Sequence, residues 1–431
     1  WDCTEKRTAL QIPWAPKDPI AGIAWISYVS SGRSPANRRT RNMIYLDYNA
    51  THPPLQDIFE KNWKRYLQNP ANPSGISVAS QKNQAFIDKK RKSISDALGW
   101  KPDSVKFAST GTEATYWLVK SFAARRPEAS HCILSSCEHD AMIAACQDAG
   151  LKIVYLPVTR QGLTDPAELA KLLQSGKLES GNLQPHSVAF ASIIHASNET
   201  GVIQPVEELS AICRSYEIPF LSDCIQSAGK IPLPMEWLDG LLLNGHKLGA
   251  GAGTSVAAFA PMYVDDIASL YRGGLQEEET RAGTENLLSI ASMADAFCFQ
   301  LENMEKKTLR LSPLHADLEG FLKDRGVTIA GEDSPRLSNT TYAVFSNVEH
   351  MDFLLMGLDQ AGIVCSTGSS CKSRTRQPSR ILLKMGFSEK ESMQALRFSS
   401  GINTTGSDFG TLKETLAPIL ERLTRSSATS T

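Results

Sequence analysis

The stretch Leu241-Leu242-Leu243-Asn244-Gly245-His246-Lys247 joins a short apolar run to a polar segment that ends in a lysine. An apolar run followed by Asn-Gly is typical of a buried strand that ends in a turn. Open α/β proteins bind their ligands at the edge of the sheet where the parallel strands end. The stretch therefore predicts an α/β protein in which Lys247 lies in a turn at a ligand-binding edge. A solvated surface lysine is the competing interpretation.

The chain on both sides of this stretch alternates between short apolar runs and longer amphipathic segments. The apolar runs predict strands at residues 104–108, 131–135, 152–156, 187–194, 220–222, 240–243 and 254–259. The amphipathic segments predict helices at residues 113–124, 141–149, 165–174 and 206–216. Strands that alternate with helices favour a mostly parallel sheet with helices on both faces.

The length of 431 residues predicts more than one domain. Because the pattern changes near residue 295, we expect a large domain at 57–295 and a smaller α+β domain at 296–431, with residues 43–56 packed against the small domain. Residues 1–42 contain four prolines and no periodic apolar pattern. We expect them to be a leader that is disordered or not native. A transit peptide is the alternative, although such peptides contain few acidic residues and this segment has three.

Composition excludes several classes of function. The formal net charge is -1, whereas nucleic acids and anionic membranes attract proteins with a basic excess. No apolar run approaches the roughly 20 residues that span a bilayer. The nine cysteines are irregularly spaced and form no CxxC pair, so we expect neither a disulfide framework nor a metal site. These features favour a cytoplasmic protein.

A carboxylate precedes Lys247 at the end of another apolar run. Asp223 follows residues 220–222, and Gln226 comes shortly after it. Chemistry with pyridoxal 5′-phosphate needs a carboxylate that keeps the pyridine nitrogen protonated and a lysine that binds the cofactor. Asp223 and Lys247 are these two groups in a suitable order. A helix N-cap is the competing interpretation of Asp223.

Two further segments follow predicted strands. Ser109-Thr110-Gly111-Thr112-Glu113 precedes a predicted helix, and phosphates bind to the N–H groups at helix starts. A capping box is the other interpretation of this segment. His139 begins another predicted helix, where its ring can stack on a flat ligand or serve a structural role.

Two residues near the C-terminus are candidates for substrate chemistry. Cys371 lies in the polar, glycine-containing segment 366–378 beside three basic residues, so we expect an exposed loop with a reactive thiol. Most free cysteines are instead buried and inert. Arg397 ends a short predicted strand and is suited to bind a carboxylate with both arms of its guanidinium. A surface ion pair is the alternative.

Together these segments resemble the motifs of the cysteine desulfurases of the NifS/IscS type, within the class V aminotransferase superfamily. The resemblance runs in order from Ile44 to about Thr405 and covers most of the chain. Its motifs are YLDYNAT at 45–51, NPS at 72–74, EH at 138–139, HASNETGVIQP at 195–205, DCIQSAGK at 223–230, NGHK at 244–247, GGLQE at 273–277, RAGTEN at 281–286, SSC at 369–371 and RFSSG at 397–401. Such an ordered series is far more specific than any single motif.

The resemblance implies the fold-type I architecture of pyridoxal-phosphate enzymes, an α/β fold with a mostly parallel seven-stranded sheet in the large domain. It implies that Lys247 binds the cofactor, that Asp223 pairs with the pyridine nitrogen and that His139 stacks on the ring. Thr284 would reach the phosphate of a neighbouring subunit, so a homodimer is expected. The residues that the resemblance assigns to the cofactor are Gly111, Thr112, His139, Asn198, Asp223, Gln226, Asn244, His246, Lys247 and Thr284.

The resemblance also implies a reaction. Lys247, Cys371 and His139 would be catalytic, and Asn198 and Arg397 would bind the substrate L-cysteine. Sulfur would leave as a persulfide on Cys371, with L-alanine as the other product. The spacing from Cys371 to Pro378 resembles the longer-loop branch of the family, which passes sulfur to an acceptor protein, such as an iron–sulfur scaffold. A selenocysteine lyase, another fold-type I lyase and a non-catalytic paralogue that binds a partner are the alternatives.

Several residues depart from the pattern of the family. Asn244 stands where a phosphate-binding serine is usual, and Thr110-Gly111 replaces Gly-Ala. Residues 249–253 replace the usual GxPKG, Glu278 replaces a basic residue and Ile402 replaces an arginine. We expect a divergent member of the family, with a changed sulfur acceptor or a reduced activity.

Overall fold

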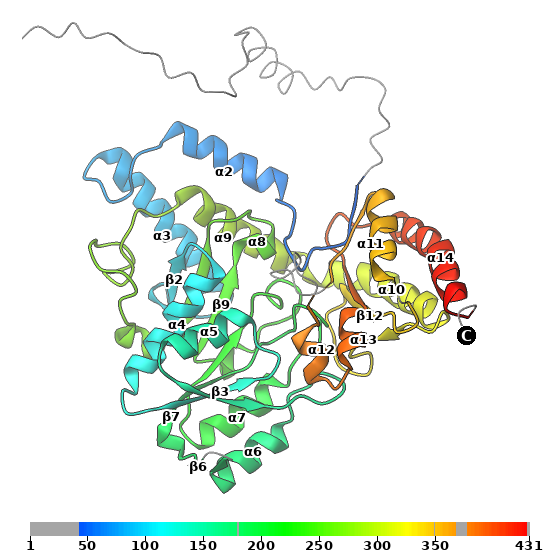
Figure 1. Ribbon diagram of the computed structural model, residues 1–431. Helices are drawn as coiled ribbons and strands as arrows, with labels where there is room; N and C mark the ends of the chain where they lie inside the picture. Colours follow the sequence, from blue (N-terminus) through cyan, green and yellow to red (C-terminus); the bar gives the residue numbers. More distant parts are fainter. Residues whose placement is uncertain (1–42, 179–180, 349, 368–376, 429–431) are drawn as a thin grey trace, which may run out of the picture. The chain divides into compact units, whose positions relative to one another are not determined.

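The computed structural model describes residues 43–178, 181–348, 350–367 and 377–428 (Figure 1). Its central element is a seven-stranded sheet with the strand order β2-β10-β9-β8-β7-β3-β4. Six strands run in the same direction, and β10, between β2 and β9, runs in the opposite direction. The strands are β2 (Val105–Ala108), β3 (His131–Ser135), β4 (Lys152–Leu156), β7 (Val188–Ser192), β8 (Phe220–Asp223), β9 (Gly240–Asn244) and β10 (Ser255–Phe259). Each predicted apolar run forms one strand, which confirms the mostly parallel seven-stranded sheet.

Helices cover both faces of this sheet because successive strand residues point to opposite sides. In β9, Leu241 and Leu243 belong to one apolar core and Leu242 to the other. The first core includes residues of α3 (Val78–Leu98), α6 (Pro166–Ser175), α7 (Val206–Ser215) and α9 (Leu287–Glu302). The second includes residues of α4 (Gly111–Arg125) and α5 (Asp140–Asp148).

The four predicted helices are present with small shifts at their ends. The largest shift concerns α4, which begins at Gly111 and not at Glu113. The cause is local, because the Thr110 side chain accepts a hydrogen bond from the Glu113 N–H at 3.1 Å and so caps the helix two residues earlier. Gly111 and Thr112 therefore lie in the first turn of the helix.

The C-terminal part contains a smaller antiparallel sheet with the order β11-β12-β14. Its strands are β11 (Thr328–Ile329), β12 (Thr340–Val344) and β14 (Ala395–Ser399). Its helices are α10 (Met304–Lys323), α11 (Met351–Gln360), α12 (Arg380–Lys384), α13 (Glu389–Met393) and α14 (Gly406–Ala428). The N-terminal strand β1 (Ile44–Tyr45) pairs in parallel with β13 (Ile363–Val364), and Leu46 lies in the apolar core of this part. The start of the described chain thus packs with residues more than 300 positions away.

The remaining elements are short or peripheral. They are α2 (Gln56–Gln68), α8 (Gly245–Leu248), the strands β5 (Lys177–Leu178) and β6 (Gly181–Asn182), and the 3-10 helices Pro102–Ser104, Pro185–Ser187, Met235–Trp237 and Pro261–Asp266. The expected domain boundary at residue 295 falls inside α9. Among the described helices, none combines the length and the apolar character needed to cross a bilayer.

Candidate functional site

A cavity of about 500 Å³ lies at the edge of the large sheet where the parallel strands end. Its wall is formed by residues that follow β2, β3, β7, β8 and β9, and by residues 378, 380 and 381 from the C-terminal part. The sequence-predicted residues on this wall are Gly111, Thr112, His139, Asn198, Asp223, Gln226, Asn244, His246 and Lys247. Thr284 and Arg397 do not line the cavity, and Cys371 lies outside the described residues.

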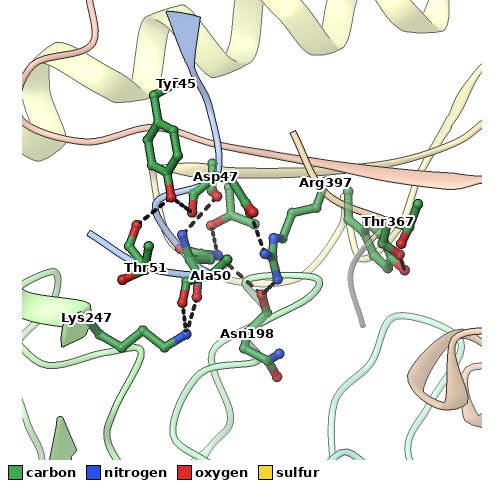
Figure 2. A network of polar contacts seen from close by, with 12 residues as sticks. Tyr45, Asp47, Ala50, Thr51, Asn198, Lys247, Thr367 and Arg397 are labelled. Atoms are coloured by element: carbon green, nitrogen blue, oxygen red, sulfur yellow. Dashed lines mark hydrogen bonds and ion pairs between the residues drawn. The ribbon is translucent and has the colours of Figure 1, made fainter. Parts of the chain in front are cut away.

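Lys247 lies in the one-turn helix α8, not in the simple turn that the sequence predicts. The turn becomes helical because the Asn244 side chain accepts the His246 N–H at 3.2 Å, and Gly249 ends the helix with a positive φ of 93°. The Lys247 Nζ donates hydrogen bonds to the main-chain oxygens of Asn49 and Ala50, both at 2.6 Å (Figure 2). The amine is therefore held by hydrogen bonds to the N-terminal segment of the described chain.

Asn49 connects these carbonyls, which bind Lys247, to the rest of the site. Its main-chain oxygen also accepts the Gln226 Nε2 at 2.8 Å, and its side-chain oxygen accepts the Lys230 Nζ at 2.9 Å. Its Nδ2 donates to Thr340 Oγ1 of β12 at 2.9 Å. Asn49 belongs to the YLDYNAT motif, but we did not single it out from the sequence, because its partners lie far away along the chain.

Lys230 is a second lysine beneath Lys247. Its Nζ donates to Gln226 Oε1 at 2.8 Å, so both polar ends of the Gln226 amide are used by Asn49 and Lys230. Burial, followed by repulsion from Lys247, holds the pKa of Lys230 well below its usual value. No carboxylate of the described chain forms an ion pair with Lys230 within 4.0 Å. The neighbourhood of Lys247 therefore disfavours further positive charge.

Asp223 ends β8 on the cavity wall and is buried. Its Oδ1 accepts the Ile225 N–H at 2.9 Å, which fixes the orientation of the carboxyl group. Burial raises the pKa of Asp223, while that hydrogen bond and the charges on His139 and Lys247 lower it. A carboxylate in such a setting gains much from a cationic N–H donor, because little water competes for it.

His139 is the N-cap of α5, as its position before a predicted helix indicated. Its Nδ1 accepts the Ala141 N–H at 3.1 Å, which orients the ring at the cavity wall. The preceding Glu138 is a buried acid that the sequence reasoning missed, although it belongs to the EH motif. Burial, followed by repulsion from Asp223, raises the pKa of Glu138 well above its usual value. Its burial and the neighbouring Asp223 thus both favour the protonated form of Glu138.

His246 lies on the wall next to Lys247. Its Nδ1 is 3.1 Å from the Thr51 hydroxyl, again on the N-terminal segment. Burial, together with the charge on Lys247, lowers the pKa of His246 to about 4. The imidazole is therefore neutral at neutral pH and can act as a hydrogen-bond donor without adding charge.

Arg397 lies in the middle of β14 and is completely buried. Its Nη2 forms a 2.6 Å ion pair with Asp47 Oδ1, and its Nη1 donates to the Asn198 main-chain oxygen at 2.8 Å (Figure 2). The alternative of a surface ion pair is wrong, because the pair is internal. Burial raises the pKa of Asp47, and Arg397 opposes this effect. The guanidinium thus does not line the cavity itself but contacts the main chain of Asn198, which does.

Glu199 is another buried acid on the wall that the sequence reasoning did not select. Its Oε2 accepts the Ser379 Oγ at 2.5 Å and lies 3.2 Å from the Tyr342 hydroxyl. The same hydroxyl is 3.2 Å from the Thr367 main-chain oxygen. Thr367 and Ser379 lie on the two sides of residues 368–376, which include Cys371. Ser379 therefore contacts the Glu199 carboxyl group directly, and Thr367 is linked to it through Tyr342.

The departure at Glu278 has a structural counterpart. Glu278 forms a 2.6 Å ion pair with Lys106, a residue of β2 that is 2% exposed. Glu277, Glu278 and Glu279 all have positive φ values, of 47°, 56° and 63°. The neighbouring Glu277 holds Arg91 through two hydrogen bonds of 2.8 Å. An acidic residue at 278 is thus matched by a buried lysine.

This chain is similar to several known proteins. Residues 44–412 match the model of the family described as Aminotransferase class-V. The cysteine desulfurase IscS of Dictyoglomus turgidum is 33% identical over 390 residues, which cover 88% of this chain and 95% of that protein. The solved NifS-like protein from Rickettsia africae is 29% identical with a TM-score of 0.77, over 88% of this chain and all of that one. A structure described as SspA in complex with cysteine is 25% identical with a TM-score of 0.69, over 83% of this chain and 98% of that one.

Proposed function

Because the chain belongs to the Aminotransferase class-V family, among the cysteine desulfurases of the IscS and NifS type, we propose that it removes sulfur from L-cysteine. This family depends on pyridoxal 5′-phosphate. The observation that carries the proposal is the cavity itself, which brings Lys247, Asp223 and His139 to one wall together with the start of α4. The substrate would be L-cysteine and the products L-alanine and a persulfide on Cys371.

The residues of the cavity fit the cofactor. Its volume lies within the range of about 300–1,000 Å³ that is usual for small-molecule sites. Asp223 is a buried carboxylate suited to a protonated pyridine nitrogen, and Lys247 is an amine at the same wall. In the part of the chain that the structure describes, the N–H groups of Gly111 and Thr112 have no hydrogen-bond acceptor. Such donors at the first turn of a helix suit a phosphate.

Each residue has a task that follows from its position. Lys247 would hold the cofactor covalently and carry the proton to and from the α-carbon of the substrate. Asp223 would keep a proton on the pyridine nitrogen, and the bound cofactor then supplies an electron sink for the negative charge at that carbon. The Lys247 amine can return to the carbonyls of Asn49 and Ala50 whenever it is not bonded to the cofactor.

Arg397 and Asn198 would bind the substrate carboxylate. Support for this role comes from the buried guanidinium of Arg397, whose Nη1 already contacts the Asn198 main-chain oxygen on the cavity side. A substrate carboxylate would compete with Asp47 for the same cation. Asp47 therefore sets how much positive charge Arg397 offers to a ligand.

Cys371 would take the sulfur. Its thiolate attacks the substrate sulfur, so that a sulfur–sulfur bond forms while the bond between that sulfur and the β-carbon breaks, with the electron pair left on carbon. A proton then completes the methyl group of L-alanine. The balance needs no external oxidant, and an added thiol releases the outer sulfur as sulfide.

The partners follow from the same proposal. Thr284 is exposed and does not line the cavity of its own subunit, which supports a homodimer in which it serves the neighbouring site. The sulfur would pass to an acceptor protein, for which an iron–sulfur scaffold is a candidate. The described cysteines are all free thiols, which supports a reducing, cytoplasmic setting.

The test begins with the absorbance spectrum of the purified protein. A band that disappears with borohydride, with the cofactor then found on the peptide containing Lys247, is expected. Alanine should form from cysteine. A desulfurase should form it faster from cysteine than from selenocysteine, and a selenocysteine lyase should show the reverse order. A spectrum without a reducible band would favour the non-catalytic paralogue.

The role of Cys371 needs its own variant. Cys371→Ala should retain the chromophore and lose the production of sulfide. Cys298→Ala, at a partly buried cysteine of α9, is the matched control and should keep the parental rate. Parental sulfide production by Cys371→Ala in the presence of a thiol would exclude the persulfide route.

A further inference from the structure

Gly111 is a glycine for reasons of space, not of backbone conformation. Its φ lies outside the left-handed region that favours glycine. A Cβ atom at this position would lie 2.7 Å from Asn244 Nδ2 and 3.3 Å from Ile225 Cδ1. The first distance is shorter than any normal contact, so the Asn244 side chain occupies the place that an alanine methyl group at 111 would need.

Asn244 is held in this position. Its Oδ1 accepts the His246 N–H at 3.2 Å as the cap of α8, which identifies the oxygen and leaves Nδ2 on the side of Gly111. Asn244 also pairs with Ser255 in the ladder between β9 and β10. A movement of the amide away from Gly111 would disturb this cap.

The other polar groups at the start of α4 are already used. Thr110 Oγ1 accepts the Glu113 N–H, and Glu113 Oε2 accepts the Ser109 N–H at 2.9 Å. Arg281 donates to both Glu113 Oε1 and Ser109 Oγ, at 2.8 and 2.7 Å. Residues 109, 110 and 113 therefore satisfy one another and cap the helix.

Three N–H donors remain on this part of the wall. They are the main-chain N–H groups of Gly111 and Thr112 and the Nδ2 of Asn244, and none has an acceptor among the described residues. Donors without acceptors that converge at a helix start suit a doubly charged phosphate group.

From this geometry we propose that Gly111 and Asn244 are a matched pair, in which the missing side chain at 111 lets the Asn244 amide join the phosphate-binding donors. The departures from the family pattern at positions 111 and 244 would then depend on each other. The inference rests on the proposed function, because it assigns the phosphate of the cofactor to these donors.

The test compares four forms of the full chain, after the cofactor has been removed with hydroxylamine. They are the parent, Gly111→Ala, Asn244→Ser and the double variant. The dissociation constants of pyridoxal 5′-phosphate and of pyridoxal are measured for each. Both compounds can bond to Lys247, so the dissociation constant of pyridoxal divided by that of pyridoxal 5′-phosphate reports on the phosphate alone.

Gly111→Ala should reduce this ratio by about tenfold or more, the usual effect of losing a hydrogen bond to a charged group, because its methyl group displaces the Asn244 amide. Asn244→Ser should keep most of the ratio, because a serine hydroxyl can also donate to the phosphate. The double variant should recover most of the loss, because the smaller serine makes room for the methyl group introduced at position 111. Protection of the cofactor-free protein against heat by inorganic phosphate should follow the same order. Unchanged affinity for pyridoxal shows that a variant is folded. If Gly111→Ala does not fold, Asn244→Ala tests the amide donor alone, and the same tenfold loss is expected.

The outcomes separate the two hypotheses. A double variant that binds the phosphate no better than Gly111→Ala would overturn the matched pair, as would a parental ratio in Gly111→Ala. If the parent bound pyridoxal 5′-phosphate no better than pyridoxal, the proposed function would fail together with this inference.

Discussion

Ser379 donates a 2.5 Å hydrogen bond to the buried carboxyl group of Glu199. The bond joins the described chain shortly after segment 368–376 to the cavity wall. Since Tyr342 lies between the same carboxyl group and Thr367, Glu199 is placed to position the chain on both sides of Cys371. Under the proposed function, Glu199 would therefore help to position the Cys371 thiol.

Ser379→Ala should therefore slow the transfer of sulfur to Cys371 by about tenfold, the effect of losing one hydrogen bond to a charged or strongly polar group. The affinity for pyridoxal 5′-phosphate should not change. Single-turnover formation of alanine, measured beside cofactor binding, checks both expectations.

Ser388→Ala is the matched control for this variant. Both serines are N-caps of short helices, α12 and α13, so both replacements should cost about 1 kcal/mol of stability. Only Ser379 contacts Glu199. Equal slowing by the two variants would mean that stability, and not position, limits the rate.

Asp47→Asn should destabilise the protein by about 3 kcal/mol, because it leaves the buried Arg397 cation without its carboxylate. The product L-alanine carries a carboxylate that can replace it. The rise in melting temperature on adding L-alanine should thus be larger for Asp47→Asn than for the parent.

Glu319→Gln provides the comparison for Asp47→Asn. Glu319 forms a similarly enclosed ion pair with Arg336 at 2.8 Å in the C-terminal part, and neither residue lines the cavity. This variant should lose stability without the additional response to L-alanine. The same response in both variants would contradict a link between Asp47 and substrate binding.

Glu138→Gln should stabilise the protein, and more so as the pH rises. Burial raises the pKa of Glu138 well above its ordinary 4.5, so the folded state binds this proton more tightly than the unfolded state does. Stability from this group is thus present below about pH 4.5 and falls as the pH rises toward the folded pKa. Glutamine has no proton to lose.

Melting temperatures of the parent and of Glu138→Gln at pH 5 and pH 8 check this expectation. The difference between the two proteins should be larger at pH 8. A constant difference would show that Glu138 does not titrate between folded and unfolded states in this range.

Glu278→Arg should destabilise the protein by about 2 kcal/mol, because it places a cation beside the buried Lys106. Glu278→Gln should cost less, about 1 kcal/mol, since Glu278 itself is largely exposed and screened by water. Chemical denaturation gives both values.

Lys106→Met in the Glu278→Arg background removes the repulsion and should restore most of the stability. If Glu278→Arg were equally harmful with methionine at 106, the cause would be the strained backbone at 277–279 and not the charge.

The elements of the large sheet could be predicted because each strand is a separate apolar run. The run at 131–135 and the run at 152–156 became β3 and β4 without any shift. The cavity residues that follow these strands could also be predicted, since parallel strands bring their ends to one edge. This is why Asp223 and Lys247 lie on the same wall.

Other features could not be predicted because their causes lie far away in the chain. The seat of Lys247 is formed by carbonyls almost 200 residues earlier. The counter-ion of Lys106 is 172 residues away, and the place of Arg397 depends on an aspartate 350 residues away. Local patterns contain no information on such pairs, and the isolated sequence therefore showed Glu278 only as a departure from the family pattern.

The position of Asn49 has a consequence for the order of assembly. Asn49 receives bonds from Lys247 through its main-chain oxygen and is itself held by Ser399 Oγ, 350 residues further on. A nascent chain that ends before β14 lacks this support, however well its large sheet has formed. We expect Lys247 to form its hydrogen bond with Asn49 only when β14 is in place, because contacts so distant in sequence form late. Capture of the cofactor would then report that β14 has been synthesised and has folded.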